Sequence, residues 1–321
     1  MLNSHNPKIS IVIATYNGAS YLQEQLDSIA VQTLQPYEII IQDDHSSDKT
    51  SAIIRHNMLK LPIKFYENLE NLGYIRNFES ALAKAEGDYI ALCDQDDIWV
   101  PQKLELLMEA IGSKSLAYAD STLIDSEGNP LGKTLSEKLR NRFIEAESPL
   151  SFVYDNCVSA HAMLFRHSLL KHLFPFPKNL YFDAWVAACA SSENGISYVD
   201  KALVGYRQHS SNTLSTHQKP KNSFFDTLFS KQTKKSEEHS SRVAVIDDLL
   251  HVHGLIDSER ALLQKLKIAH ASFERHWFNF HLMYLLLQNR SILFAITRRC
   301  PLILALKKSI GLKLYRFFPF L

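Results

Sequence analysis

The 321-residue sequence predicts an α/β fold in which a mostly parallel, twisted sheet is flanked by helices. Short β-branched runs alternate with segments of helical periodicity, and polar, acid-rich stretches follow several of the runs. No apolar run reaches the ~18 residues needed to cross a bilayer. Because parallel strands place their carboxyl ends at one edge of a sheet, we expect the polar stretches to form a ligand site there.

The first hundred residues contain four predicted strands. They are expected at Lys8–Ala14, Tyr37–Gln42, Ile63–Tyr66 and Gly87–Leu92, and helical periodicity follows each of the first three. In the second half, further strands are expected at Leu116–Asp120, after Ala162, and as two short closing strands at Ile196–Asp200 and Ala202–Tyr206. This order predicts right-handed crossovers between parallel strands.

Three carboxylates, those of Asp94, Asp96 and Asp97, follow the fourth strand. Crowded carboxylates repel one another, which favours a shared proton or a bound divalent cation. With oxygen ligands, that cation would be Mg²⁺ or Mn²⁺. The acids could instead cap the helix expected after Pro101, but one cap needs one acid, so we favour a site for a metal and a diphosphate.

The loop after the first strand excludes two nucleotide-binding classes. No Gly-x-Gly-x-x-Gly and no Gly-Lys-Ser/Thr follows it, which counts against a dinucleotide-binding domain and a Walker-type triphosphatase. Tyr16 offers a ring on which a base can stack, and Asp44 an acceptor for the imide N–H of uracil or thymine. An ordinary turn at Tyr16–Gly18 and helix capping by Asp43–Asp48 are the simpler alternatives.

Composition limits the partners and the compartment. The formal net charge of +1 argues against a nucleic-acid partner. The four cysteines are far apart, and the polar first residues lack the apolar core of a signal peptide, so we expect a cytoplasmic protein.

Four segments in succession resemble the motifs of family 2 glycosyltransferases with the GT-A fold. They are Ala14–Gly18, Asp43–Asp48, Asn71–Gly73 with Asn77–Phe78, and Asp94–Trp99. The sequence of the last motif, Asp-Gln-Asp-Asp-Ile-Trp, is similar to that of the bacterial rhamnosyltransferase-like branch. The resemblance implies inverting transfer of a sugar from a nucleotide donor. It also implies nucleotide-binding roles for Thr15, Tyr16, Asn17, Asp43, Asp44, Asn71, Gly73, Asn77, Asp94 and Arg207.

The same resemblance assigns the remaining site residues. Asp96 and His209 would hold the cation, and Ala160 with His161 would pass the donor sugar, although the family usually has glycine at the position of Ala160. His161 could instead be a hydrogen-bonded, partly buried histidine. Asp183 matches the acidic residue that presents the catalytic base, a role compatible with capping its helix.

Three regions are expected along the chain. Residues 1–212 would form the GT-A catalytic domain, with a nucleotide-binding half (1–100) and an acceptor-side half (101–212). Residues 213–241 read as a linker, and residues 242–321 as a helical, basic extension without any acid after Glu274. Such helices suit an anionic membrane surface, and the alternatives are a helical cap docked on the sheet or an oligomer interface.

The expected function is metal-dependent, inverting transfer of a sugar from a UDP- or dTDP-sugar to a glycan or lipid-linked acceptor. Peripheral attachment to the cytoplasmic face of the inner membrane would suit a lipid-linked acceptor. A receiver-like signalling domain is disfavoured because Tyr66-Glu67-Asn68 lacks a phospho-acceptor Asp after the third strand. A catalytically silent GT-A-like scaffold at the membrane remains the alternative, since Ala160 is unusual.

Overall fold

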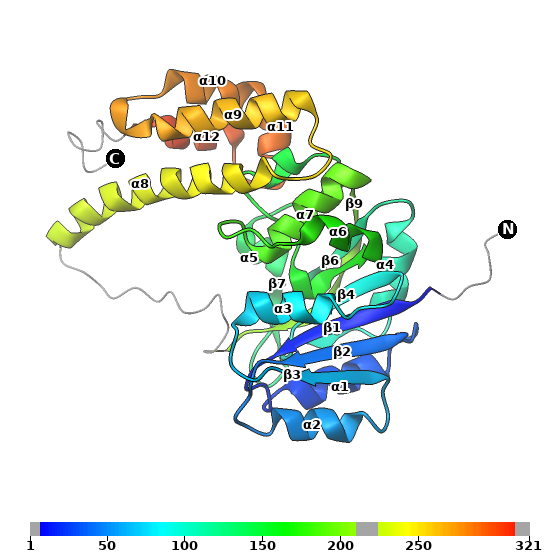
Figure 1. Cartoon of the computed structure of the whole chain (residues 1–321). Helices are drawn as coiled ribbons and strands as arrows, with labels where there is room; N and C mark the ends of the chain where they lie inside the picture. The colour runs from blue at the N-terminus through cyan, green and yellow to red at the C-terminus, as the bar shows by residue number, and fades with distance from the viewer. Residues whose placement is uncertain (1–6, 210–223, 312–321) are drawn as a thin grey trace.

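The computed structural model describes residues 7–209 and 224–311 and is built around one nine-stranded sheet (Figure 1). The sheet has the order β3-β2-β1-β4-β8-β6-β9-β5, and β7 pairs with β6 outside this path. The strands are β1 (Ile9–Thr15), β2 (Glu38–Asp43), β3 (Ile63–Glu67), β4 (Tyr89–Cys93), β5 (Ile98–Trp99), β6 (Leu116–Ile124), β7 (Pro130–Thr134), β8 (Met163–Arg166) and β9 (Ile196–Arg207).

Helices cover both faces of this sheet. The longer ones are α1 (Leu22–Ala30), α2 (Thr50–Asn57), α3 (Tyr74–Leu82), α4 (Lys103–Ile111), α7 (Phe182–Glu193), α8 (Phe224–Leu249), α9 (Asp257–Ala271), α10 (Phe280–Gln288) and α12 (Pro301–Ser309). Shorter ones are α5 (Leu135–Leu139), α6 (Leu170–Leu173), α11 (Arg290–Leu293), η1 (Pro149–Phe152), η2 (Ala160–Ala162), η3 (His167–Leu169) and η4 (Phe273–Arg275).

The predicted α/β sheet is confirmed, and it is mixed because antiparallel strands join the parallel ones. Strands β1 to β4 pair in parallel as predicted, but β8 lies antiparallel between β4 and β6. The two predicted closing strands are one strand, β9, parallel to β6. Its register shifts where Ala119 pairs with Val199 and Asp120 pairs with Ala202, so Asp200 and Lys201 form a bulge.

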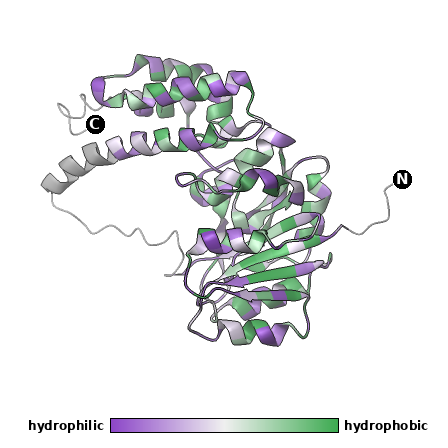
Figure 2. Ribbon diagram, in the orientation of Figure 1, coloured by the Kyte–Doolittle hydropathy of each residue, from purple (hydrophilic) through white to green (hydrophobic). Residues whose placement is uncertain are grey.

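Two hydrophobic cores lie on the two faces of the sheet. One includes Leu26 of α1 and Leu107 of α4, and the other includes Phe78 of α3 and Trp185 of α7. The strands β1, β2 and β4 are largely hydrophobic along their length (Figure 2) because helices cover them on both sides. Their carboxyl ends therefore meet at one edge, where the polar loops emerge.

The C-terminal helices dock on the catalytic domain, as the helical-cap alternative predicts. Ile246 of α8 and Leu266 of α9 belong to the same core as Trp185, and Tyr154 bonds to His270 at 2.7 Å. The linker predicted at 213–241 is wrong from residue 224 onward, where α8 begins, and its earlier part lies outside the described residues. None of the helices within the described ranges is both long and apolar enough to span a bilayer.

Candidate active site

The acid-rich loop between β4 and β5 is held in place by Arg207 at the end of β9. The Arg207 backbone N–H donates to Asp97 Oδ1 at 3.1 Å, and its Nε donates to the Asp96 carbonyl at 2.8 Å. Its guanidinium also pairs with Glu24 of α1 and donates to the Ser126 carbonyl. The side chain is buried and positions the acidic loop, while its predicted nucleotide-binding role stays a prediction.

Asp96 and His209 are 113 positions apart in the sequence and lie side by side in the fold. His209 Nε2 is 2.7 Å from Asp96 Oδ2, and the imidazole packs on the ring of Tyr21. Burial and the neighbouring charge of Asp94 raise the pKa of Asp96, although the contact with His209 opposes this shift. One carboxylate and one imidazole are a donor pair that suits Mn²⁺.

A second group of donors lies beside this pair. Atoms of Asp94, Asp97 and His161 lie within 4.8 Å of one another, and in the described part of the chain they form the only such group of three. Asp97 Oδ2 is buried without a hydrogen-bond partner among the described residues. Burial raises the pKa of Asp97 to about 7. An orphaned carboxylate oxygen and an imidazole nitrogen fit a divalent cation, so this cluster is a further candidate metal site.

His161 is a buried residue with defined partners. Its Nε2 bonds to Ser121 Oγ at 2.8 Å, and its ring stacks on Tyr206 with centroids 4.5 Å apart. Burial favours the neutral imidazole, but the carboxylates of Asp97 and Asp94 outweigh it and raise the pKa of His161. The hydrogen-bonded alternative thus describes its surroundings, while contact with a donor sugar stays a prediction.

A buried lysine that sequence analysis did not single out supports this histidine. Lys103 Nζ donates to the His161 carbonyl at 2.6 Å and lies 3.2 Å from the centroid of the Trp99 ring. Burial lowers the pKa of Lys103 to about 7. In the sequence it appears as an ordinary first-turn residue of a helix, and only its full burial distinguishes it.

The two acids after β2 bond to the surrounding chain. Asp43 accepts from Thr15 Oγ1 at 2.7 Å and from the backbone N–H of Ser46 at 2.8 Å. Asp44 accepts from the backbone N–H groups of Leu72 and Gly73, both at 2.8 Å. Asp43 and Thr15 are buried and hydrogen-bonded to each other, so they support the loop that follows β2.

The loop from Asn68 to Gly73 is fixed by the same acid. Asn68 Nδ2 donates to Asp44 Oδ1 at 2.7 Å, and Asn71 Nδ2 donates to the Asp44 carbonyl at 3.3 Å. Gly73 has a φ of +82°, a conformation that favours glycine. Asn77 is buried and donates to the Gln42 carbonyl, so it supports the loop from α3.

Tyr16 presents its ring at this edge, as the stacking prediction requires. The side chain is 50% exposed, and Gln95 holds its backbone by accepting from the Tyr16 N–H and donating to the Tyr16 carbonyl. Asn17 has a positive φ of 46°, and its Oδ1 accepts from the Ser47 N–H. Gln95 belongs to the acidic motif. The sequence carries no signal for its contact with the Tyr16 backbone, because the three neighbouring acids point to metal binding.

Asp183 lies in the first turn of α7, electrostatically close to the acidic loop. Tyr181 is the N-cap residue of this helix, which corrects the suggested capping role of Asp183. Burial raises the pKa of Asp183 to about 6, and the nearby charges of His161 and Asp94 also act on it. Desolvation therefore outweighs the helix dipole, which favours the ionised carboxylate at the start of a helix.

Comparison with known proteins identifies the family of this chain. The profile described as Glycosyl transferase family 2 matches residues 10–174, about half of the chain. The chain belongs to glycosyl transferase family 2. The matched segment runs from β1 through the acidic loop to the end of α6, so it contains most of the candidate site but not Asp183, Arg207 or His209.

Two relatives of this family 2 member are uncharacterized glycosyltransferases. One, from Nostoc sp., is 27% identical over 217 residues, which are 64% of this chain and 66% of the relative. The other, from Methanocaldococcus jannaschii, is 29% identical over 248 residues, 70% of this chain and 83% of the relative. The chain thus spans about two thirds of the length of the first and more of the second.

Solved structures confirm the GT-A-like fold. S. aureus TarS in complex with UDP-GlcNAc superposes with a TM-score of 0.60 at 18% identity, covering 90% of this chain and 79% of TarS. A Pyrobaculum calidifontis mannosyltransferase in complex with GDP-Man and Mn²⁺ gives a TM-score of 0.51 at 16% identity, covering 94% and 74%. At these identities the likeness extends to the fold alone.

Proposed function

We propose that this family 2 member transfers a sugar, with inversion, from a nucleoside diphosphate sugar to a hydroxyl of a bacterial surface polysaccharide or lipid-linked oligosaccharide. A UDP- or dTDP-sugar is the proposed donor, with dTDP-rhamnose as one candidate. The observation that carries the proposal is the 2.7 Å contact between Asp96 and His209, which lie 113 positions apart in the sequence. Gln95 of the same loop holds Tyr16 beside them, and Asp183 interacts electrostatically with Asp94.

The nucleoside would lie against the loops after β1 and β2. The exposed Tyr16 ring supports base stacking, and Asp44 supports recognition of an imide N–H. An ionised carboxylate offers about four acceptor positions. Among the described residues, Asp44 accepts from three donors, on Asn68, Leu72 and Gly73, which leaves one acceptor position for the base. Asp94, whose side chain is 36% exposed, is the proposed partner of the ribose.

A divalent cation, Mg²⁺ or Mn²⁺, would be held by Asp96 and His209. Both side chains retain solvent access, at 20% and 13% exposure, whereas Asp97 is fully buried and less open to a diphosphate. When bound, the cation would offset the negative charge of the diphosphate. Asp94, Asp97 and His161 form the alternative ligand set, with Ala160 and His161 as the proposed neighbours of the donor sugar.

Asp183 would take the proton from the acceptor hydroxyl as that oxygen attacks. A base works best when its pKa lies near the working pH, and burial moves the pKa of Asp183 to about 6. Tyr74 interacts with this carboxyl: burial raises the pKa of Tyr74, and the charge of Asp183 raises it further. Both groups can therefore line the acceptor side of the site.

The C-terminal helices support a peripheral location at the cytoplasmic face of an anionic membrane. Phe280 and Tyr284 of α10 and Ile303 of α12 are between 52% and 74% exposed. Arg299 and Lys307 lie on the same unit. Apolar and basic side chains together are the combination that binds anionic lipid. The same surface could hold a second copy of the chain.

Nucleotide binding tests the proposal directly. Calorimetric titration of the purified chain with UDP and dTDP should show binding that requires Mn²⁺, and Asp96→Ala should abolish it. Asp27→Ala, at an exposed position of α1, is the matched control and should bind as the parent chain does. If neither nucleotide binds in the presence of Mn²⁺, both the enzymatic function and the site assignment are wrong.

A further inference from the structure

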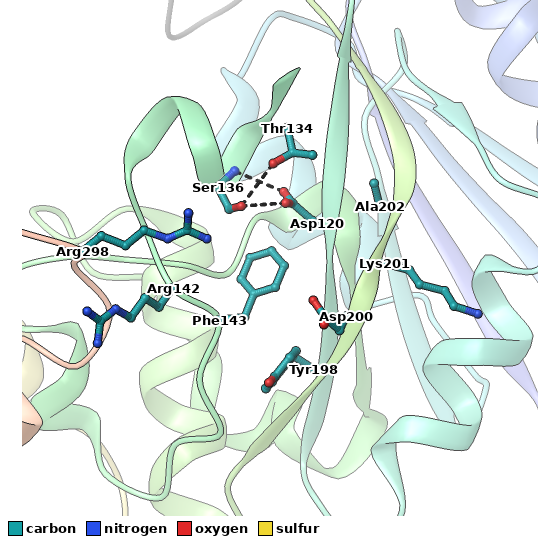
Figure 3. A pocket seen from close by; sticks show the side chains of 10 residues that line it. All are labelled: Asp120, Thr134, Ser136, Arg142, Phe143, Tyr198, Asp200, Lys201, Ala202 and Arg298. Atoms are coloured by element: carbon teal, nitrogen blue, oxygen red, sulfur yellow. Dashed lines mark hydrogen bonds between the residues drawn. The ribbon is translucent and has the colours of Figure 1, made fainter. Parts of the chain in front are cut away.

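A cavity of about 410 Å³ lies where the catalytic sheet meets the C-terminal helices (Figure 3). Its lining combines residues of β6 and β9, the segment from Thr134 to Phe143, and Arg298 from the connection between α11 and α12. The two units are joined here by backbone hydrogen bonds from Arg142 to Ile296 and from Arg298 to Arg140. The volume falls in the range of small-molecule sites, about 300–1,000 Å³.

This cavity is separate from the active site. Asp120 lines the cavity, whereas Ser121, the next residue of β6, holds His161 on the active-site side. Successive residues of a strand point to opposite faces of the sheet, so β6 stands between the two. None of the residues assigned above to nucleotide, cation or base lines the cavity.

The polar side of the cavity includes the carboxylate of Asp200 and the guanidinium of Arg298. The bulge in β9 directs Asp200 toward Phe143 and Tyr198, while Arg298 extends toward Ser136 from the other side (Figure 3). Within residues 7–209 and 224–311, neither side chain has a hydrogen bond or an ion pair, and the two are not paired with each other. A carboxylate acceptor and a guanidinium donor therefore face the same space unengaged.

The other acid of the lining, Asp120, already has hydrogen-bond partners. Its carboxylate accepts from Ser136 Oγ at 2.7 Å and from the backbone N–H groups of Ser136 and Ser121. It therefore fixes the start of α5 and contributes little uncompensated charge.

The apolar side of the cavity consists of two aromatic rings. Phe143 and Tyr198 have centroids 5.9 Å apart, and both pack against the buried ring of Tyr118. Tyr198 is 37% exposed, so part of its ring is open to a ligand. Tyr118 is itself held by hydrogen bonds to the backbone of Ile144, which makes the aromatic wall rigid.

We propose that this cavity binds one or two pyranose rings of a saccharide. A sugar ring has an apolar C–H face and a rim of hydroxyls, and the cavity offers a complementary aromatic wall and a carboxylate–guanidinium pair. The C–H face packs on Phe143 and Tyr198, while adjacent hydroxyls donate to Asp200 and accept from Arg298. In a glycosyltransferase this sugar would belong to the acceptor chain, away from the reacting hydroxyl. That last placement rests on the proposed function; the binding itself does not.

Saturation-transfer NMR on the full chain tests the inference with three defined disaccharides: galactobiose, chitobiose and digalacturonic acid. At least one should bind, and Asp200→Asn and Arg298→Gln should each weaken that binding about tenfold, the loss expected for a charge-assisted hydrogen bond. Arg299→Gln, at the neighbouring exposed arginine outside the lining, is the matched control and should have no effect. A preference between the neutral and acidic disaccharides identifies the sugar class.

Two further measurements separate this cavity from the donor site. Excess UDP with Mn²⁺ should not displace the disaccharide, and Asp96→Ala should retain disaccharide binding while losing UDP. The inference is wrong if none of the three disaccharides binds, if UDP displaces the bound one, or if Arg299→Gln weakens binding as much as Arg298→Gln. Binding of inorganic phosphate alone, without any disaccharide, would equally overturn it.

Discussion

The two acidic loops, after β2 and after β4, resemble each other in sequence and differ in chemistry. Asp43 and Asp44 accept hydrogen bonds from backbone N–H groups and from side chains of neighbouring loops. In the loop after β4, Asp97 Oδ2 has no partner among the described residues, and burial raises the pKa of Asp96 and of Asp97. The acids after β2 are hydrogen-bonded by the chain and mainly hold loops in place, whereas Asp96 and Asp97 after β4 have raised pKa values and an oxygen, unpartnered in the described part of the chain, that a ligand can engage.

Asp183, in α7, extends this comparison to an acid outside the two loops, and its substitution should have the largest effect. Burial raises the pKa of Asp183 to about 6, so Asp183 resembles the acids after β4, which can act on a ligand. Asp183→Asn should lower sugar transfer about 10²- to 10⁴-fold, the usual contribution of a general base, and leave UDP binding unchanged. In the parent chain, activity should fall as the pH drops below about 6, because the base becomes protonated. Full transfer activity in the Asn variant would remove Asp183 from the mechanism.

Asp44 is the opposite case, and its loss should destabilise the fold. Asp44→Ala leaves the N–H groups of Leu72 and Gly73 without their acceptor. We expect the free energy of unfolding to fall by about 2–4 kcal/mol and UDP binding to weaken with it. Urea unfolding measures the first quantity, and Asp44→Asn, which keeps one acceptor oxygen, should lose less. Equal stability of the Ala variant and the parent chain would contradict the supporting role.

Asp97 should make stability depend on pH. Because burial raises its pKa to about 7, the folded state binds more protons than the unfolded state between about pH 4 and 7. Stability should therefore fall as the pH rises through this window and level off above it. Asp97→Asn should flatten the decline, by an amount on the order of 1–3 kcal/mol. Urea unfolding at pH 5 and pH 8 in the presence of EDTA measures the difference in the free energy of unfolding between the two pH values. The same difference in the variant and the parent chain would show that Asp97 is not the group responsible.

Gly18 should give the smallest effect. A Cβ at this position would overlap the side chain of Gln95, which holds the backbone of Tyr16. Gly18→Ala should displace Gln95 and weaken UDP binding by about threefold, because the lost hydrogen bonds are partly exposed. In a Gln95→Ala background the same substitution should add nothing further. An additive loss in the double variant would place the effect of Gly18 elsewhere.

Local sequence patterns are sufficient to predict the first half of the fold and the sheet edge that carries the site. The β-branched runs and the periodicity of helices α1 to α3 are local patterns, and parallel strands bring their ends to one edge whatever follows. The motif order was sufficient to place Asp96 and His209 in one hypothesis, and the structure puts their side chains 2.7 Å apart.

The role of each polar residue depends instead on how the chain packs. The antiparallel insertion of β8, the bulge at Asp200 and the docking of α8 depend on contacts between distant segments, and no local pattern encodes them. The sequence indicates a ligand contact for Arg207, but its side chain is buried and hydrogen-bonds to the acidic loop. Lys103 is an ordinary helix residue in the sequence, but in the fold it is fully desolvated. Burial and hydrogen-bond satisfaction are properties of the packed chain, and they decide whether a charged group is structural or reactive.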